Sequence, residues 1–419
     1  MRSKTNSNDG YIPSSPEAEF LLSCTSTNID SERTKRLKRI LQNGINWEYL
    51  FTMALANNIL LLLYFHINNS CLELIPDKYL NYLREYCHKT TLSNLSISQE
   101  LLKLLKLFKA KNISIIPFKG PVITSYLYGN LSLREFSDLD FLVKENDMHL
   151  IKEILISEGY IPEYSLAKSQ EDAFFKYHYQ LVFQTKTGPE IDIHWRVVQK
   201  YFNNNFKFNE LWNNLQEIEF GGQTIKSLSP EDLLLILCIH GAKDSWSELK
   251  LIIDIAQLIK NKKIKWEAVT KRARILDMEK VFHLGILLTN ILFKIEIPKT
   301  VLEKAKADPL VISLSKEVCT KTFNNISGPP EIKEQCIFQL KILDSFLHKI
   351  RYCFSLVITP TIGDWSFISF PKYLSFLYYI TRPLRLIKKY MFGSLKPLIG
   401  SLPSSSNTKE KDVGYSVGL

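Results

Sequence analysis

The sequence predicts an α+β fold in which a small mixed β-sheet is embedded between an N-terminal and a C-terminal helical region. From about residue 16 to 110, and again from about 210 to 395, apolar residues recur at every third or fourth position, as in amphipathic helices. Between these stretches, β-branched runs end at Gly and Pro, which indicates strands and turns. We expect a disordered N-terminus at 1–15, a helical region at 16–110, an α/β core at 111–200, a helical region at 201–400 and a disordered tail at 401–419.

Composition restricts the class of protein without naming a substrate. The chain has 419 residues, a formal net charge of +10 and a pI near 9.0, which favours anionic partners such as nucleotides, nucleic acid or a membrane surface. Its seven cysteines are dispersed, and none forms the CxxC pair of a zinc site. This usage is typical of a reducing compartment, and the first residues form no apolar signal-peptide segment, so we expect a cytoplasmic protein.

The N-terminal helical region contains the least charged run of the chain, at 50–71. Its length nearly suffices to cross a bilayer, but its asparagines and histidine are unfavourable in lipid, so we expect a buried helix. A second apolar stripe predicts a helix over 96–112, with Ser96 or Ser98 as its N-cap.

The α/β core is predicted from a series of short segments. A β-branched run at 113–118 ends at Lys119–Gly120–Pro121 and turns into a helix with Pro at its first position. A second strand starts at Asp138, and an amphipathic helix follows at 148–160. Two more strands, at 177–184 and 190–197, are joined by the sequence TKTGP, which suits a hairpin.

Two carboxylates lie one residue apart at the start of the second strand. Residues two apart in a strand share one face, so Asp138 and Asp140 project together while Leu139 and Phe141 point into the core. Carboxylates this close repel each other unless a cation lies between them. Mg²⁺, with Mn²⁺ as an alternative, prefers such hard oxygen ligands and often shares them with substrate phosphates.

The strand at 190–197 repeats this arrangement, because Asp192 and His194 share one of its faces. If this strand lies beside the one that starts at Asp138, Asp192 completes a cluster of three carboxylates with Asp138 and Asp140. Such a cluster suits two metal ions that bracket an in-line phosphoryl or nucleotidyl displacement.

Phosphate-binding groups are expected next to the carboxylates. At Lys119–Gly120 a strand gives way to a helix, where Gly lets the backbone approach a phosphate and the helix N-terminus adds free N–H groups. Arg134 and Ser137, just before the Asp pair, could hold phosphate oxygens as well.

Each of these features has a purely structural alternative. Asp–x–Asp alone is more often a solvated strand end, Lys–Gly is common at turns, and Asp192 and His194 could simply face water. Their conjunction in this order is more specific than any one of them.

The order of these motifs resembles the DNA polymerase β-like nucleotidyltransferase superfamily. More closely, the chain resembles the uncharacterised nucleotidyltransferase family of bacterial proteins, which are often found in biosynthetic gene clusters. The resemblance covers residues from about 20 to 395 and is carried by FKGPVITSYLYGN (118–130), LREFSDLDFLV (133–143), EIDIHWRV (190–197), LSPEDLLLILCIHGAKDSW (228–246), LIIDIAQLI (251–259) and RPLRLIKKY (382–390).

This resemblance implies a minimal nucleotidyltransferase fold and Mg²⁺-dependent transfer of a nucleoside monophosphate from an NTP to a small-molecule, peptide or protein acceptor. Carried over by position, Asp138 and Asp140 would bind both metal ions, and Asp192 would bind the catalytic ion and help deprotonate or position the acceptor oxygen. Gly120 would cradle the triphosphate. The superfamily turn is usually Gly–Ser or Gly–Gly, whereas this chain has Lys119–Gly120, further from Asp138 than is common.

Other residues are secondary candidates. His194, His240 and Asp254 are candidates for contacts with the base or the acceptor, and Lys243 for contact with phosphate. The alternative for the residues of the C-terminal helical region is a buried polar network between helices.

The segment 366–409 contains no Asp or Glu, seven Lys or Arg residues and eight aromatic residues. Such a segment could contact an anionic membrane or a peptide or RNA partner, or could pack as a helix with a solvated basic face. No aromatic RNA-binding sheet motif is present elsewhere, so we expect no nucleic acid as partner.

Two other functions are alternatives to nucleotidyl transfer. A glycosyltransferase could use Asp–x–Asp to hold a metal and a nucleotide sugar, but its fold needs an alternating βα domain before the motif, where this sequence predicts helices. A catalytically inactive binding module is the second alternative, and the three intact carboxylates argue against it because their repulsion would serve no purpose.

Overall fold

The computed structural model of the chain describes residues 15–166, 168–186, 188–198, 208–324, 330–368 and 370–388. By their internal contacts the residues divide into two units, Met1–Leu356 and Val357–Leu419. The disorder expected at the two ends falls almost entirely outside the described residues. The domain boundaries expected near residues 110, 200 and 400 stay predictions.

Helices precede the sheet, as expected. They are α1 (Pro16–Ser23), α2 (Ser31–Gln42), α3 (Trp47–Ala56), α4 (Leu60–Ser70), the short 3₁₀ turn η1 (Leu72–Leu74) and α5 (Asp77–Ala110). The predicted N-cap at Ser96 or Ser98 is wrong, because α5 starts well before them and the Ser98 hydroxyl donates to the Asn94 carbonyl inside this helix. The helix continues through both serines, and its first residue is Asp77.

The apolar run at 50–71 is buried but forms parts of two helices, α3 and α4, rather than one. The break lies at Asn57 and Asn58, and Asn58 has a positive φ of 54°. The Asn57 amide donates to the Thr322 carbonyl, and its Oδ1 accepts from the Leu249 backbone N–H. The polar residue therefore joins the N-terminal helices to the C-terminal ones. Among the described helices, none is both long and apolar enough to cross a bilayer.

The central sheet has five strands in the order β1-β2-β5-β4-β3. They are β1 (Ile115–Pro117), β2 (Asp138–Val143), β3 (Ile161–Pro162), β4 (Gln180–Gln184) and β5 (Glu190–His194). Only the β2–β5 pair is parallel among these described strands, and the predicted hairpin is the antiparallel pair β4–β5. The predicted α+β class, a small mixed sheet flanked by helices, is confirmed.

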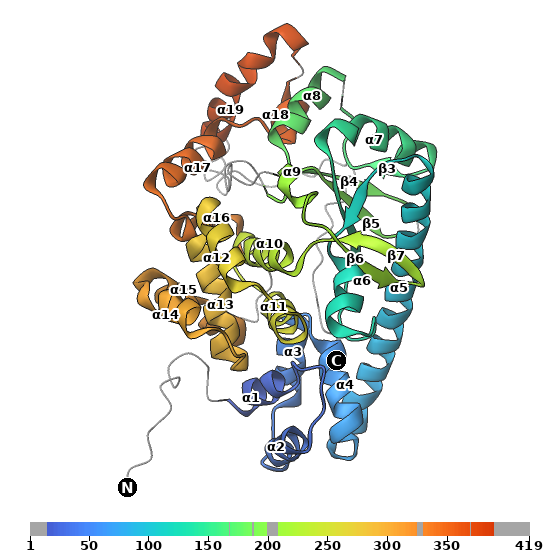
Figure 1. Cartoon of the computed structure of the whole chain (residues 1–419), viewed down its shortest axis with the longest axis vertical. Helices are drawn as coiled ribbons and strands as arrows, with labels where there is room; N and C mark the ends of the chain where they lie inside the picture. Colours follow the sequence, from blue (N-terminus) through green and yellow to red (C-terminus); the bar gives the residue numbers. More distant parts are fainter. Residues whose placement is uncertain are drawn as a thin grey trace, which may run out of the picture. The chain divides into compact units, whose positions relative to one another are not determined.

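The two faces of this sheet differ in character. Leu139, Phe141, Ile191 and Ile193 are fully buried on one face, where the Phe141 ring meets Phe108 of α5 with centroids 6.4 Å apart. The opposite face carries the acidic residues that alternate with these side chains. Figure 1 shows α5 running along the sheet.

Short helices connect the strands of the sheet. They are α6 (Gly120–Ile123), the π-helical turn η2 (Thr124–Tyr128), the 3₁₀ turn η3 (Glu145–Asp147), α7 (Met148–Ser157), α8 (Lys168–Tyr177) and α9 (Phe208–Leu211). Between α9 and the next helix, β6 (Gln216–Phe220) and β7 (Gln223–Ser227) form a hairpin in a stretch that the sequence analysis assigned to helices. Its turn is Gly221–Gly222 with φ of +56° and +74°, as a two-residue turn with a left-handed backbone requires.

The C-terminal helices of the first unit are α10 (Pro230–Lys243), α11 (Leu249–Asn261), α12 (Trp266–Ile275), α13 (Glu279–Phe293), α14 (Lys299–Ala307), α15 (Pro309–Asn324), α16 (Ile332–Ile342) and most of α17 (Phe346–Ile358). Ser229 caps α10 by accepting from the Asp232 backbone N–H. One hydrophobic core joins these helices to the N-terminal ones. The second unit contains α18 (Ile362–Phe367), the 3₁₀ turn η4 (Lys372–Leu377) and α19 (Tyr378–Ile387).

Candidate active site

The candidate site lies where β2 and β5 run side by side. In their parallel register Asp140 is opposite Asp192, and Leu142 is opposite His194. Residues at one level of adjacent parallel strands project from the same face. The strand pairing therefore brings together two acidic side chains that are distant in sequence.

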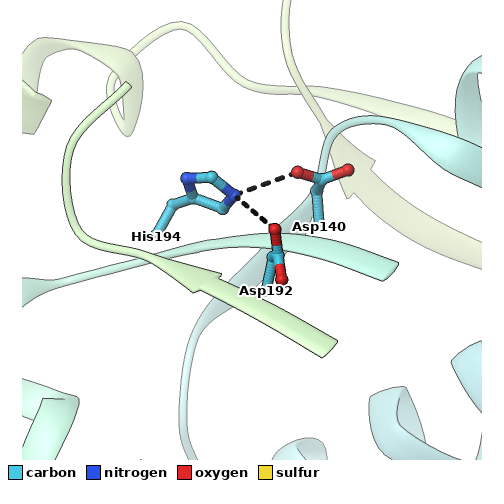
Figure 2. A group of neighbouring side chains, drawn as sticks. All are labelled: Asp140, Asp192 and His194. Carbon is cyan, nitrogen blue, oxygen red and sulfur yellow. Dashed lines mark hydrogen bonds and ion pairs between the residues drawn. The ribbon is translucent and has the colours of Figure 1, made fainter. Parts of the chain in front are cut away.

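Three side chains converge at this point: Asp140, Asp192 and His194 (Figure 2). One ligand atom from each lies within 4.8 Å of the others. The His194 Nε2 is 2.9 Å from the Asp140 Oδ1 and 4.0 Å from the Asp192 Oδ2. The Asp192 Oδ2 also accepts a hydrogen bond of 3.1 Å from the Gln180 amide on β4.

The sequence placed Asp138 in this cluster, and the structure has it at the cluster's edge. It is the first residue of β2, partly buried, and lies outside the group of three whose ligand atoms approach within 4.8 Å. Its negative charge nevertheless contributes to the raised pKa of Asp192. Ser137, the residue before it, is exposed.

Lys119 and Gly120 lie directly against the carboxylates. The Lys119 Nζ is 2.9 Å from the Asp140 Oδ1. Gly120 has a φ of +54°, and a Cβ on it would lie 2.9 Å from the Asp138 carbonyl oxygen. Only glycine fits this turn, because it combines a left-handed backbone with close packing on β2.

Charge is unbalanced in the cluster. Burial, followed by the charges of Asp140 and Asp138, raises the pKa of Asp192 to about 7. Burial and Asp140 likewise raise the pKa of Asp138. Burial opposes ionisation of Asp140 too, but Lys119 and the hydrogen bond from His194 outweigh it and hold the pKa of Asp140 well below its ordinary range. The site therefore holds more carboxylates than its own cations satisfy.

His194 is neutral at physiological pH, because burial lowers its pKa to about 4 against the opposing effect of Asp140. A neutral ring that bonds a carboxylate through Nε2 must carry its proton there. His194 therefore donates to Asp140 and orients it.

The donor set can hold a metal ion. Asp140 is 3% exposed, and its Oδ2 has no hydrogen-bond partner among the described residues. A buried carboxylate oxygen without a partner is unfavourable in the protein alone, and a divalent cation would satisfy it. Asp140 and Asp192 supply hard oxygen ligands, whereas His194 is already bonded to Asp140.

The last turn of α10 also lies near the cluster. Burial, followed by the charges of Lys119 and Lys243, lowers the pKa of His240 strongly against the opposing charge of Asp140. The His240 Nδ1 is 3.2 Å from the Asp244 Oδ2, and the Lys243 Nζ lies 5.3 Å from the Tyr179 ring centroid.

Arg134 and Asp254 are bonded to each other. The Arg134 Nε and Nη2 donate to the two Asp254 oxygens at 2.8 and 2.9 Å, and the Tyr128 hydroxyl donates to Oδ1 at 2.7 Å. All three side chains are buried. Phosphate contact by Arg134 and base contact by Asp254 would require breaking this cluster, so its geometry supports the alternative of a buried polar network between elements.

Sequence reasoning missed three polar residues around the cluster: Gln180, Tyr179 and Lys250. Lys250 lies at the start of α11, and its positive charge opposes the rise in the pKa of Asp138 and contributes to the lowered pKa of His240. Gln180 could have been found, because in an antiparallel pair with β5 it lies opposite His194 and shares its face. Lys250 had no comparable signal.

Comparison with known proteins agrees with this geometry. Residues 43–294 match the family described as uncharacterised nucleotidyltransferase. None of the curated proteins gives a significant match. A solved structure described as the lincosamide antibiotic adenylyltransferase LnuA with lincomycin bound is 18% identical over 38% of this chain and 94% of that chain, with a TM-score of 0.27, too low to add to the family assignment. Because the family match covers more than half of its residues, the chain belongs to the uncharacterised nucleotidyltransferase family and is an enzyme of the nucleotidyltransferase class.

Proposed function

We propose that this enzyme transfers a nucleoside monophosphate from an NTP to a nucleophilic acceptor with the help of Mg²⁺. The observation that carries the proposal is the pairing of Asp140 with Asp192 on parallel strands, with one buried Asp140 oxygen left without a partner. Asp140 and Asp192 would hold the cation, and Asp138 would complete the ligand set from the edge.

A bound divalent cation supplies positive charge next to the phosphates and offsets the negative charge that develops on them. The chain's own residues determine where this happens. His194 orients Asp140 through the 2.9 Å hydrogen bond, and Gln180 orients Asp192 through the 3.1 Å one. Metal ligands that are already held by such hydrogen bonds lose little conformational freedom when the ion binds.

Lysines around the cluster would bind the triphosphate. The positive charges of Lys119 and Lys250 affect the pKa of Asp138. Those of Lys119 and Lys243 affect the pKa of His194. Lys119 also bonds the buried Asp140 at 2.9 Å, so it lies between the carboxylates and the proposed phosphate position. Ser137 is exposed beside Asp138 and could donate to a phosphate oxygen.

The proposed reaction is a single displacement at the α-phosphorus. The acceptor oxygen forms a bond to this phosphorus, the bond to the oxygen that bridges to the β-phosphate breaks, and pyrophosphate leaves. Asp192 accepts the proton that the acceptor loses, in keeping with a carboxylate whose surroundings disfavour its charge. His240 at the end of α10 is a candidate for contact with the base or acceptor.

The acceptor is a small molecule, peptide or protein, and a bacterial biosynthetic pathway is a suitable setting. The predicted absence of a nucleic-acid partner and the cytoplasmic location, where NTPs are available, belong to this proposal.

The test is to incubate the enzyme with ATP, GTP, CTP or UTP labelled at the α-phosphate, in Mg²⁺ and in EDTA. We expect pyrophosphate release and transfer of α-label to the protein itself or to a fraction of a cell extract, with one nucleotide preferred. Asp140→Asn should abolish both, and Glu217→Gln, which changes an exposed carboxylate of β6 outside the site, should leave them unchanged.

Two results would contradict the proposal. Transfer of label from γ-labelled NTP, with none from α-labelled NTP, would indicate a kinase. Turnover of a UDP-sugar with no transfer of α-label would indicate glycosyl transfer instead.

A further inference from the structure

The outer face of α19 is apolar and exposed. Phe376 at the end of η4, followed by Ile380, Leu384 and Ile387, recurs every three or four residues, so these side chains form one stripe along the helix. They are 57%, 56%, 61% and 50% exposed. We call these four residues the α19 stripe.

The inner face of the same helix carries its charged and hydrogen-bonding groups. Arg382 and Arg385 both bond the buried Asp364 of α18, with Arg382 Nη1 2.8 Å from Oδ2 and Arg385 Nε 2.5 Å from Oδ1. The buried Tyr378 hydroxyl accepts from the Phe370 backbone N–H at 2.8 Å. A helix that is stable in water turns its polar face outward, and α19 does the reverse.

Charge on this segment indicates which kind of partner would cover the stripe. Residues 366–409 contain no Asp or Glu and seven Lys or Arg residues. Asp364 offsets only one of these charges, and Lys388 at the end of α19 is exposed. Lys389, Lys396 and Lys409 lie outside the described residues and enter by sequence alone. An anionic partner therefore complements the segment.

We propose that α19 binds the surface of an anionic lipid membrane, lying in its interface with the α19 stripe toward the acyl chains. Helices of this kind combine an apolar face with flanking Lys and Arg residues. Tyr373 at the preceding turn is 78% exposed and offers the apolar ring and polar hydroxyl that suit the headgroup level. The Arg382–Asp364–Arg385 cluster fixes the stripe outward, so the membrane-facing side exists before binding.

The test is co-sedimentation of the full chain with vesicles. Phosphatidylcholine vesicles with about 30% phosphatidylserine should bind the protein, and pure phosphatidylcholine should bind it far less. Binding should weaken when salt rises from roughly 0.05 to 0.5 M, because the charges become screened. The double variant Ile380→Asp, Leu384→Asp should bind at least about tenfold more weakly.

The matched control is Ile332→Asp on α16, which changes an apolar side chain of the first unit that is 78% exposed. It should bind vesicles like the wild type. All variants should keep the wild-type melting temperature, because the altered side chains face solvent.

Three results would overturn the proposal. The first is wild-type protein that does not sediment with anionic vesicles at low salt. The second is equal binding by the double variant and the wild type. The third is a dimer in solution that the double variant abolishes while vesicle binding is absent, which would identify a second copy of the chain as the partner of the stripe.

Discussion

The Asp254 and Asp140 carboxylates are both almost fully buried and both are bonded to a cation, but their surroundings differ. Asp254 has one guanidinium, Arg134, and one hydroxyl, Tyr128, which together bond both of its oxygens. We call this group the Asp254 cluster. One negative and one positive charge meet there with complete hydrogen bonding.

Asp140 belongs to a different kind of group, the carboxylate cluster, formed by Asp138, Asp140 and Asp192 with Lys119. Three carboxylates meet one ammonium group, and the Asp140 Oδ2 has no partner among the described residues. Burial, followed by this excess of negative charge, raises the pKa of Asp192 to about 7.

This difference indicates that the Asp254 cluster is structural and that the carboxylate cluster is functional. A buried ion pair that is fully bonded needs nothing from outside, whereas a buried cluster with surplus negative charge is unfavourable until a cation joins it. The Asp254 cluster also helps to position the carboxylate cluster. Asn94 of α5 donates to the Arg134 and Leu131 carbonyls, so the segment that leads into β2 is held from two sides.

The largest effect should come from Asp140→Asn, which removes a proposed metal ligand and keeps the side-chain shape. We expect nucleotidyl transfer to fall by at least about 10³-fold, since the charge that holds the cation is lost. The free energy of unfolding should fall only slightly, because the lost pairing with Lys119 and His194 is partly offset by relief of the repulsion with Asp192. Steady-state kinetics and denaturant unfolding measure the two quantities, and a variant with full activity would remove Asp140 from the site.

The opposite pattern is expected for Asp254→Asn. It leaves the Arg134 guanidinium buried without a counter-charge, which should lower the free energy of unfolding by about 3–5 kcal/mol. Activity per folded molecule should change much less than in Asp140→Asn. If this variant instead lost NTP binding while keeping its stability, Asp254 would belong to the nucleotide site.

Sequence reasoning recovered the carboxylate cluster because it depends on local periodicity. Asp138, Asp140, Asp192 and His194 alternate with buried residues on two strands, and strand alternation can be followed without knowing the fold. The Asp254 cluster could not be predicted in this way, since Arg134 and Asp254 are 120 residues apart and no pattern links them. Considered separately, Arg134 was a plausible ligand for phosphate and Asp254 for the base or the acceptor.

The hairpin β6–β7 was missed for another reason. The segment QEIEFGGQTIKS alternates Ile218 and Phe220 with polar residues around Gly221–Gly222, which is a strong hairpin signal. It stands within a long stretch of helical periodicity, and the prediction extended the helices across it. The break at Asn57 was missed because its partners, Thr322 and Leu249, are distant in sequence.

Mg²⁺ should stabilise the carboxylate cluster only when that cluster is intact. A ligand that binds only the folded state at about 100 times its Kd adds about 2.7 kcal/mol to the free energy of unfolding. We expect a rise of this order in the wild type and in Asp254→Asn, and no rise in Asp140→Asn or Asp192→Asn. Differential scanning calorimetry in Mg²⁺ and in EDTA measures it, and equal stabilisation of all four proteins would place the cation elsewhere.

The smallest effect concerns Lys119, which bonds the Oδ1 of Asp140, the carboxylate whose Oδ2 is the proposed contact of the cation. Replacing it by Met removes a competing positive charge next to the proposed metal ligands, so Mg²⁺ binding should tighten by about tenfold. The KM for NTP should rise in the same variant, because the ammonium group is also a proposed phosphate contact. Lys119→Arg keeps the charge and serves as the control, with metal affinity near that of the wild type. Isothermal titration of Mg²⁺ into the nucleotide-free proteins separates the two roles: weaker metal binding in Lys119→Met would mean that Lys119 organises Asp140 rather than competes for it.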